Sequence, residues 1–296
     1  MNSLISRLLF NTVWAIESEA ANAEIILLIN ALKGIPPTGD LEFARKESLK
    51  IAYATAGKPY SISDYGGYKS PEDAPENSVA IVSIADTIYK YDMDCGPAGM
   101  KTKANILKRI DANKNIIGCV LVIDSPGGEG SAARLMNDTI NSMNKPVIAH
   151  VEDMATSAGY YIASACDAIY ARTNQAILGS IGTYITIADF SERLKQCGIS
   201  VKEIYADKST DKNKDYYDAV EFMKSDGKSG SLDGIKFLVN KFNENFLSDV
   251  KANRSDKLNA QDDLWNTGRL IFADEAQTIG LIDGIDSLEN IIDKFY

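Results

Sequence analysis

From residue 79 onward, stretches of nearly continuous apolar residues alternate with stretches in which apolar residues recur at helical spacing. The segment IIGCVLVIDS (116–125) is typical of the first kind, and TKANILKRIDANKN (102–115) is typical of the second. Strands that are apolar on both faces and alternate with helices indicate a parallel sheet covered by helices. We therefore predict an α/β domain with strands at 79–88, 116–125, 146–151, 168–173 and 201–206, and with helices at 102–115, 130–144, 157–166, 181–199 and 233–254.

The pattern differs at the two ends of the chain. The beginning reads as a mostly helical N-terminal arm that ends in a stretch rich in Gly, Pro, Ser and Asp (58–78), which is typical of a loop or linker. We therefore expect two parts, the arm and linker in residues 1–75 and the α/β domain in residues 76–296. The C-terminal segment 268–295 predicts a short strand, a helix that ends at Gly280 and a final helix.

Composition and charge exclude several classes of partner. With 45% hydrophobic and 24% charged residues, the 296-residue chain has the composition of a soluble globular protein. Its formal net charge of −10 argues against a nucleic-acid partner, because phosphate groups are bound by basic patches. The four cysteines lack the paired spacing of a metal site, so we expect reduced thiols and neither a metal nor a cofactor.

The sequence also argues against a membrane anchor. No run approaches the roughly 18 apolar residues that a membrane span needs. The N-terminus imitates a secretory signal, with Arg7 ahead of an apolar run, but Asn11 and Thr12 interrupt that run and Glu17 and Glu19 follow it. We therefore expect an amphipathic helix in this region.

Two segments suggest acyl-transfer chemistry. Ser157 lies in MATSAGYY, where small neighbours and a following helix-compatible run would let its hydroxyl reach a substrate carbonyl at a tight turn. The apolar segment 120–125 stops at Pro126 and two glycines, whose N–H groups can face an oxyanion. We therefore predict Ser157 as the nucleophile, with the backbone N–H groups of Gly128 and Ala158 as the oxyanion hole. The alternative role for Ser157 is a helix N-cap, where serine is common.

The five sequence blocks that surround these residues resemble the SppA-type signal peptide peptidase family. That resemblance implies a ClpP/crotonase-like fold, a repeated β-β-α superhelix built on a parallel sheet. The matching blocks are IDSPGG (123–128), KPVIA (145–149), DMATSAGYYIA (153–163), LGSIG (178–182) and GRLIFADEAQTIGLID (268–283). Within this family, WAIE (14–17) and IYADKSTDKNKDY (204–216) are similar to segments of phage and prophage head proteases.

The resemblance implies a lysine as the base that activates Ser157. The chain's one histidine, His150, precedes Ser157 by seven residues, whereas the base of a ClpP-like triad arrives on a later segment, so we interpret His150 as structural. The family's lysine follows the segment VKEIYA, where we favour Lys212, with Lys208 and Lys214 as the alternatives. The family's Gly-rich turn and His-Lys pair are missing from this loop. Ser180, in LGSIG, is implied as the residue that orients the lysine.

These observations favour a serine endopeptidase with a Ser-Lys dyad that acts in phage or prophage capsid maturation. The alternatives are a soluble cellular signal-peptide peptidase, a crotonase-like protein that binds acyl-CoA, and a catalytically inactive capsid assembly protein. We expect a peptide or protein substrate that pairs as a strand with residues 127–130 and 181–184. We also expect a homo-oligomer located in the bacterial host cytoplasm or in the assembling procapsid.

Overall fold

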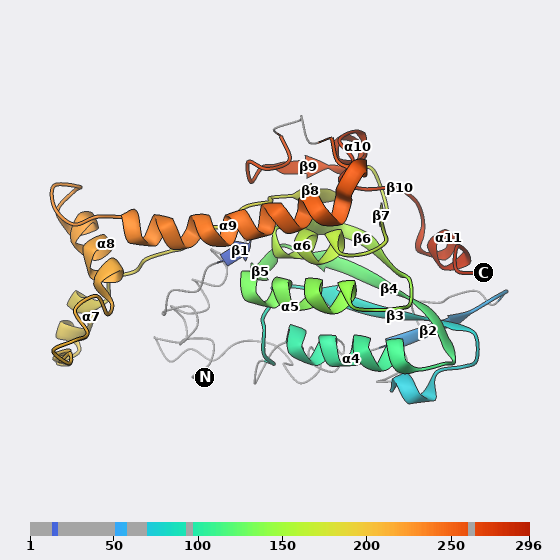
Figure 1. Cartoon of the computed structure of the whole chain (residues 1–296), viewed down its shortest axis with the longest axis horizontal. Coiled ribbons are helices and arrows are strands. Elements are labelled where there is room, and N and C mark those ends of the chain that lie inside the picture. Colours follow the sequence, from blue (N-terminus) through green and yellow to red (C-terminus); the bar gives the residue numbers. More distant parts are fainter. Residues whose placement is uncertain (1–13, 17–50, 58–69, 93–96, 260–263) are drawn as a thin grey trace.

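A computed structural model describes residues 14–16, 51–57, 70–92, 97–259 and 264–296 (Figure 1). An eight-stranded sheet runs in the order β10-β7-β6-β4-β3-β2, with β8 paired to β6 and β9 paired to β8. The neighbours β3, β4, β6, β7 and β10 are parallel, and so are β6 and β8, while β2 and β9 pair antiparallel. The strands span β2 (Ile51–Thr55), β3 (Ser78–Ala85), β4 (Ile116–Ser125), β6 (Val147–Thr156), β7 (Ala168–Ala171), β8 (Ile177–Gly179), β9 (Leu270–Phe272) and β10 (Gly284–Ile285).

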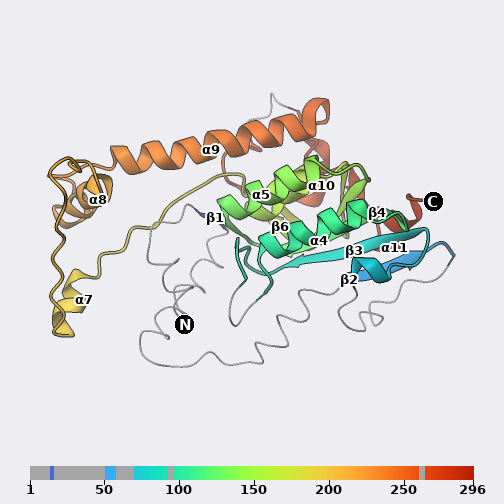
Figure 2. The same ribbon diagram turned by 60° about the horizontal axis from the view of Figure 1, so that its bottom comes forward.

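Helices cover both faces of this sheet because its central strands are apolar on both faces. One face packs against α4 (Met100–Ala112), α5 (Gly130–Asn141) and α6 (Ala158–Ser164), which lie side by side in Figures 1 and 2. The alternate residues of β2, β3 and β4 form a second apolar cluster with α11 (Leu288–Asp293) on the other face. This two-faced core is what the continuous apolar strands predicted, and the α/β class with a mostly parallel sheet is confirmed.

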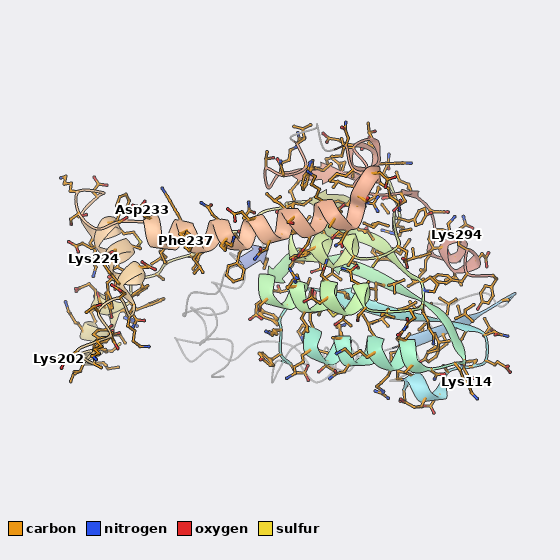
Figure 3. All side chains as sticks on the ribbon, in the orientation of Figure 1. Lys114, Lys202, Lys224, Asp233, Phe237 and Lys294 are labelled. Atoms are coloured by element: carbon orange, nitrogen blue, oxygen red, sulfur yellow. The ribbon has the colours of Figure 1, made fainter. Side chains whose placement is uncertain are left out.

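A long helix, α9 (Asp233–Arg254), joins the sheet domain to a projection, which we define as residues 185–242. The C-terminal half of α9 packs on α6, where Phe246 stacks on Tyr161 with ring centroids 4.4 Å apart. The other half carries α7 (Ser191–Gln196) and α8 (Lys214–Lys224) away from the sheet in both Figures 1 and 2. Figure 3 labels Lys202, Lys224 and Phe237 in this projection.

The projection departs from the sequence prediction in three places. Residues 201–206 are not a strand, because none of the described strands lies beside them and Val201 and Ile204 are 66% and 88% exposed. Only residues 191–196 of the predicted helix at 181–199 are helical, and α8 begins inside a run that we expected to be a polar loop. By contrast, α9 covers the whole of the helix predicted at 233–254.

The described parts of the N-terminal arm contain two strands and a 3₁₀ turn. β2 extends the main sheet, and β1 (Trp14–Ile16) pairs antiparallel with β5 (Gly127–Glu129). A 3₁₀ turn, η2 (Pro71–Asp73), precedes β3. The remaining arm residues lie mostly outside the described part of the chain, so the helical arm and the division at residue 75 stay predictions.

The C-terminal segment has the elements that its pattern predicts, with one addition. After α9 come η3 (Ser255–Lys257), β9 and α10 (Ala273–Thr278). Gly280 follows α10 with a φ of 81°, a left-handed conformation that glycine adopts without a steric penalty. The short strand β10, which the pattern did not predict, then leads to α11.

Candidate active site

Ser157 occupies the sharp turn between the end of β6 and the start of α6. Its φ of 56° and ψ of −118° form a conformation that a non-glycine residue rarely adopts and that costs roughly 1–3 kcal/mol. Two backbone hydrogen bonds hold it: the Ser157 N–H donates to the Gly179 carbonyl at 2.8 Å, and the Tyr161 N–H donates to the Ser157 carbonyl at 2.9 Å. The turn sets Ser157 at the carboxyl end of the parallel strands, as a strained strand-to-helix turn does for nucleophilic serines.

The Ser157 side chain does not cap the helix that it precedes. Its hydroxyl makes no capping hydrogen bond to α6, and no other partner for it occurs among the residues that the structure describes. The residue is only 1% exposed. A buried hydroxyl without a structural hydrogen bond fits a nucleophile better than the N-cap alternative.

Gly128 lies in β5, where the chain comes very close to Ile88. A Cβ atom at Gly128 would stand 2.0 Å from the Ile88 carbonyl oxygen, so only glycine fits. The Ile88 N–H donates to the Gly127 carbonyl, and the Glu129 N–H donates to the Ile88 carbonyl, both at 2.8 Å. Because backbone groups alternate along a strand, the Gly128 N–H faces the opposite edge of β5.

The turn before β5 is held by Ser125. Its hydroxyl donates to the Asp86 carbonyl at 2.6 Å and accepts from the Gly127 N–H at 3.2 Å. Gly127 itself has a φ of 104°, which requires glycine. These bonds fix the start of the strand that carries Gly128.

The second predicted oxyanion donor, Ala158, is the first residue of α6. Its N–H therefore has no acceptor within the helix. Ser125 pairs with Ala155 across β4 and β6, and a Cβ at Gly159 would lie 3.1 Å from the Ser125 carbonyl oxygen. The ends of β4 and β6 thus bring β5 against α6, and Gly128 and Ala158 to the same end of the sheet as Ser157.

Ser180 follows Gly179, which pairs with Thr156 in the ladder between β8 and β6. Because Ser157 donates to the Gly179 carbonyl, Ser180 lies next to the backbone of Ser157. Its φ is 48°, and its N–H donates to the Arg269 carbonyl at 2.7 Å. Ser180 is placed beside the nucleophile, and its role toward a lysine stays a prediction.

The three predicted lysines lie far from this cluster in the single chain. Lys208 and Lys212 are exposed residues of the segment before α8, and Lys214 is the exposed first residue of α8. Figures 1 and 2 place α8 at the outer end of α9, away from α6. The single chain therefore gathers the predicted nucleophile and the predicted oxyanion donors but does not bring any of these lysines to them.

A different lysine, Lys103 of α4, has the burial that a neutral amine needs. It is 1% exposed, and burial lowers its pKa to about 8. Its ammonium donates to the Ser83 carbonyl on β3. Sequence reasoning missed it, although it shares a buried helix face with Met100 and Leu107 at spacings of three and four residues.

His150 has a structural environment, as predicted. It pairs in register with Val122 and Tyr170, two residues of the apolar cluster beneath α11. Its Nε2 lies 3.2 Å from the Asp286 carbonyl oxygen, and burial lowers its pKa. These partners place the imidazole on the sheet face opposite α4, α5 and α6.

A pocket of about 250 Å³ lies between α5, α6 and α9. Phe242 and Phe246 of α9 and Tyr161 of α6 supply apolar walls, and the Arg134 guanidinium lies 2.8 Å from the Asp249 carboxylate. Gly130 and Thr183 also line it, and each belongs to a segment that we expect to pair with substrate. This pocket is the candidate site for a substrate side chain.

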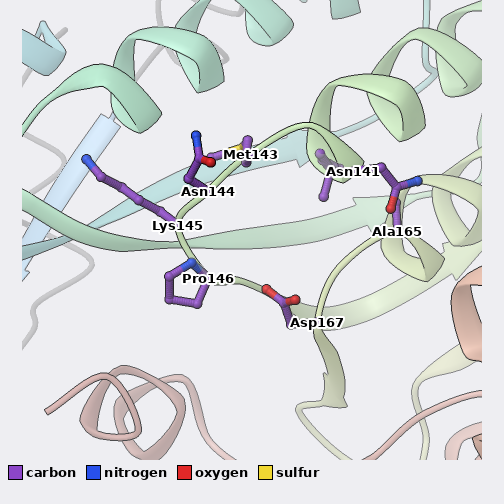
Figure 4. A pocket seen from close by; sticks show the side chains of 8 residues that line it. Asn141, Met143, Asn144, Lys145, Pro146, Ala165 and Asp167 are labelled. Atoms are coloured by element: carbon purple, nitrogen blue, oxygen red, sulfur yellow. The ribbon is translucent and has the colours of Figure 1, made fainter.

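A second pocket, of about 310 Å³, lies where α5 leads into β6 (Figure 4). Since Ser157 follows the last residue of β6, this pocket lies at the opposite end of that strand. Lys145 on its wall donates to the Ile110 carbonyl at 2.8 Å, and Asp167 accepts from the Val147 N–H at the same distance. Its polar groups therefore serve the local structure.

The described residues contain no group of three or more His, Cys, Asp or Glu side chains that could hold a metal ion. Cys119 and Cys166 are buried free thiols, and burial raises the pKa of Cys119 to about 12. Within the described ranges, no helix is both long and apolar enough to cross a lipid bilayer.

Comparison with known proteins gives one family match, to the model for peptidase family S49, over residues 139–295. A Brucella abortus protein named Na(+)/H(+) antiporter NhaA is 30% identical over 228 residues, which are 75% of this chain and 30% of that protein. Protease 4 of Haemophilus influenzae is 32% identical over 126 residues, 42% of this chain and 20% of that protein. Head-tail preconnector protein GP5 of Enterobacteria phage P21 is 34% identical over 136 residues, 44% of this chain and 27% of that protein.

The chain thus spans less than a third of the length of each of these three relatives. Among solved structures, a ClpP1 mutant from Listeria monocytogenes is 12% identical with a TM-score of 0.42, covering 71% of this chain and 92% of that one.

Proposed function

Because the chain belongs to peptidase family S49, we propose that it is a serine endopeptidase in which Ser157 is the nucleophile. The observation that carries this proposal is the Ser157 turn itself. A strained, buried serine at the carboxyl end of the sheet has a hydroxyl that makes no hydrogen bond to any residue in the described part of the chain. The N–H groups of Gly128 and Ala158 are the donors for the oxyanion.

The reaction proceeds through an acyl-enzyme. A neutral amine takes the Ser157 hydroxyl proton while the oxygen attacks the substrate carbonyl carbon. The carbonyl oxygen becomes an oxyanion that accepts hydrogen bonds from Gly128 and Ala158, each worth on the order of 3 kcal/mol. The intermediate then expels the amine product, which takes the proton from the base, and water releases the acyl group by the same two steps.

The base is a lysine, with Lys212 favoured over Lys208 and Lys214. A free lysine has a pKa near 10.4, so holding it neutral at pH 7 costs about 4.6 kcal/mol. An exposed side chain gains nothing toward that cost, because desolvation is what disfavours the ammonium form. The lysine therefore works only where another surface buries it.

A second copy of the chain supplies that surface. The projection exposes large apolar side chains that a fully solvated segment does not need, namely Ile199, Val201, Ile204, Tyr205, Tyr217, Met223, Phe237, Leu238 and Phe242. Exposed apolar surface of this kind supports an interaction site. We infer that the projection of one copy covers the sheet domain of its neighbour and brings a lysine to the neighbour's Ser157.

For the biological role, we propose capsid maturation in a phage or prophage. The support is the phage P21 relative, whose name is head-tail preconnector protein, together with the WAIE segment. The protein would then act in the bacterial cytoplasm or inside the assembling procapsid, on scaffold or capsid proteins. The alternatives are a soluble cellular peptidase, which the resemblance to Protease 4 favours, and an inactive assembly protein.

The test is intact-mass analysis after reaction with a fluorophosphonate. The wild type should gain one adduct, Ser157→Ala none, and Lys212→Met should react at least about a hundredfold more slowly, as for loss of a general base. Lys103→Met is the matched control, since it removes a buried lysine that the proposal does not use. Slow labelling of Lys103→Met together with unchanged labelling of Lys212→Met would move the base to α4. A folded, oligomeric wild type that takes no label would favour the inactive assembly protein.

A further inference from the structure

The outer edge of β5 is occupied by a segment of the same chain. β1 pairs antiparallel with it, with Trp14 opposite Glu129, Ala15 opposite Gly128 and Ile16 opposite Gly127. More than a hundred residues separate the two strands in the sequence. The contact therefore brings the N-terminal arm to the strand that carries the candidate oxyanion donor (Figure 1).

The direction of the backbone groups decides what β1 covers. Ile88 uses the Gly127 carbonyl and the Glu129 N–H on one edge of β5. The N–H and carbonyl of Gly128 must then point to the other edge, because these groups alternate along a strand. That edge is where Ala15 lies, so the N–H that would bind an oxyanion faces the backbone of Ala15.

The burial of Ile16 and of Ser157 agrees with a substrate site that β1 already occupies. Ile16 is only 5% exposed, and it lies outside the two apolar core clusters that the described residues form. Ser157 is 1% exposed, so a substrate carbonyl cannot reach its hydroxyl in this arrangement without a displacement. An extended substrate that placed its carbonyl against the Gly128 N–H would need the edge that β1 holds.

We propose that residues 14–16 occupy the edge of β5 to which the substrate binds, and that they inhibit the enzyme until they are displaced. This inference rests on the proposed function and deepens it. Ala15 takes the place of the substrate residue whose carbonyl would face Gly128. Substrate and β1 compete for one row of backbone hydrogen bonds on β5.

The test compares Ala15→Pro with Ala15→Ser in the full-length chain. Proline has no N–H and cannot stay in a paired strand, whereas serine keeps the N–H and is nearly as small. Ala15→Pro should react with the fluorophosphonate at Ser157 about tenfold faster than the wild type, which corresponds to about 1.4 kcal/mol of lost competition. Ala15→Ser should stay within about twofold of the wild-type rate.

Amide hydrogen exchange gives a readout that does not depend on catalysis. Exchange in residues 127–129 should accelerate in Ala15→Pro and stay unchanged in Ala15→Ser. Faster exchange with no label on any variant would contradict the proposed function while supporting the pairing. Unchanged exchange, or labelling rates equal to wild type in both variants, would overturn the inference.

A peptide added to the protein distinguishes loss of the β1 pairing from misfolding of the Ala15→Pro variant. A synthetic peptide of residues 12–18 should slow the labelling of Ala15→Pro, because it refills the open edge, and the same peptide with proline at position 15 should not. Equal effects of the two peptides on the labelling rate would contradict the inference, whatever the stability of the variant.

Discussion

At the scale of single residues, backbone constraints define the candidate site more sharply than side-chain contacts do. Ser157 is held at a φ of 56° by two hydrogen bonds, and Gly128 is required by the approach of Ile88. Neither constraint strengthens the apolar core. Local backbone strain of this kind lowers stability and is found mostly at functional sites.

Lys103 carries a pH-dependent stability that can be isolated by substitution. Burial lowers its pKa to about 8, so between that pH and about 10.5 the folded chain holds it neutral while the unfolded chain keeps it protonated. The unfolded state then binds more protons than the folded state, so the free energy of unfolding increases as pH rises. Relative to Lys103→Met, the wild type should gain about 2 kcal/mol between pH 7.5 and pH 10.

Urea denaturation at the two pH values measures this difference directly. The comparison with Lys103→Met cancels the other groups that titrate in the same range. Parallel changes in the two proteins would mean that Lys103 is as solvated in the folded chain as in the unfolded one.

At the scale of elements, the sequence pattern predicts the strands and helices whose own residues show which of their faces is buried. The core strands β3, β4 and β6 are continuous apolar runs, and α4, α5 and α9 have apolar residues at helical spacing, so each was predicted, although β6 ends at Thr156 and was expected to end at residue 151. The three-residue strands β1, β5 and β8 carry no such pattern, since a strand of that length exists only through its partner. For residues 201–206 the pattern predicted a strand that does not form. These residues have a strand-like composition, but none of the described strands pairs with them, so they stay irregular.

The residues of the candidate site also differ in how well the sequence predicts where they lie. Ser157, Gly128 and Ala158 come from contiguous motifs next to strand ends, and the parallel sheet places strand ends together. The proposed lysine base could be predicted only as one of three in a loop, because in our proposal its position depends on contacts between copies of the chain. Lys103 was missed because a lysine on an apolar helix face is usually exposed.

The exposed apolar side chains of the projection should be needed for assembly and not for folding. Phe237 is 73% exposed on α9. Phe237→Glu should lower the oligomer mass measured by light scattering and slow fluorophosphonate labelling by about tenfold or more, while unfolding free energy changes by less than about 0.5 kcal/mol.

Lys236→Glu is the matched control, an exposed neighbour on the same helix that gains the same negative side chain. It should keep both the oligomer mass and the labelling rate. If Phe237→Glu lowers neither, the projection does not form the interface.

At the scale of the whole molecule, the chain separates the residues that we propose to form one site. The sheet domain holds the proposed nucleophile, the proposed oxyanion donors and strand β1, while the projection holds the predicted lysines (Figures 1 and 3). A protein built in this way would be inactive as a single copy. Activity would require both assembly, which supplies the base, and displacement of β1, which opens the edge.

The most direct test of this account is complementation between two inactive variants. Ser157→Ala keeps the lysine, Lys212→Met keeps the serine, and co-expression lets the two chains assemble together. The mixed oligomer should recover roughly a quarter of wild-type fluorophosphonate labelling, since half of the copies carry the serine and half of their neighbours carry the lysine. The label should lie only on the Lys212→Met chain. Co-assembled variants that remain unlabelled would contradict a site completed between copies.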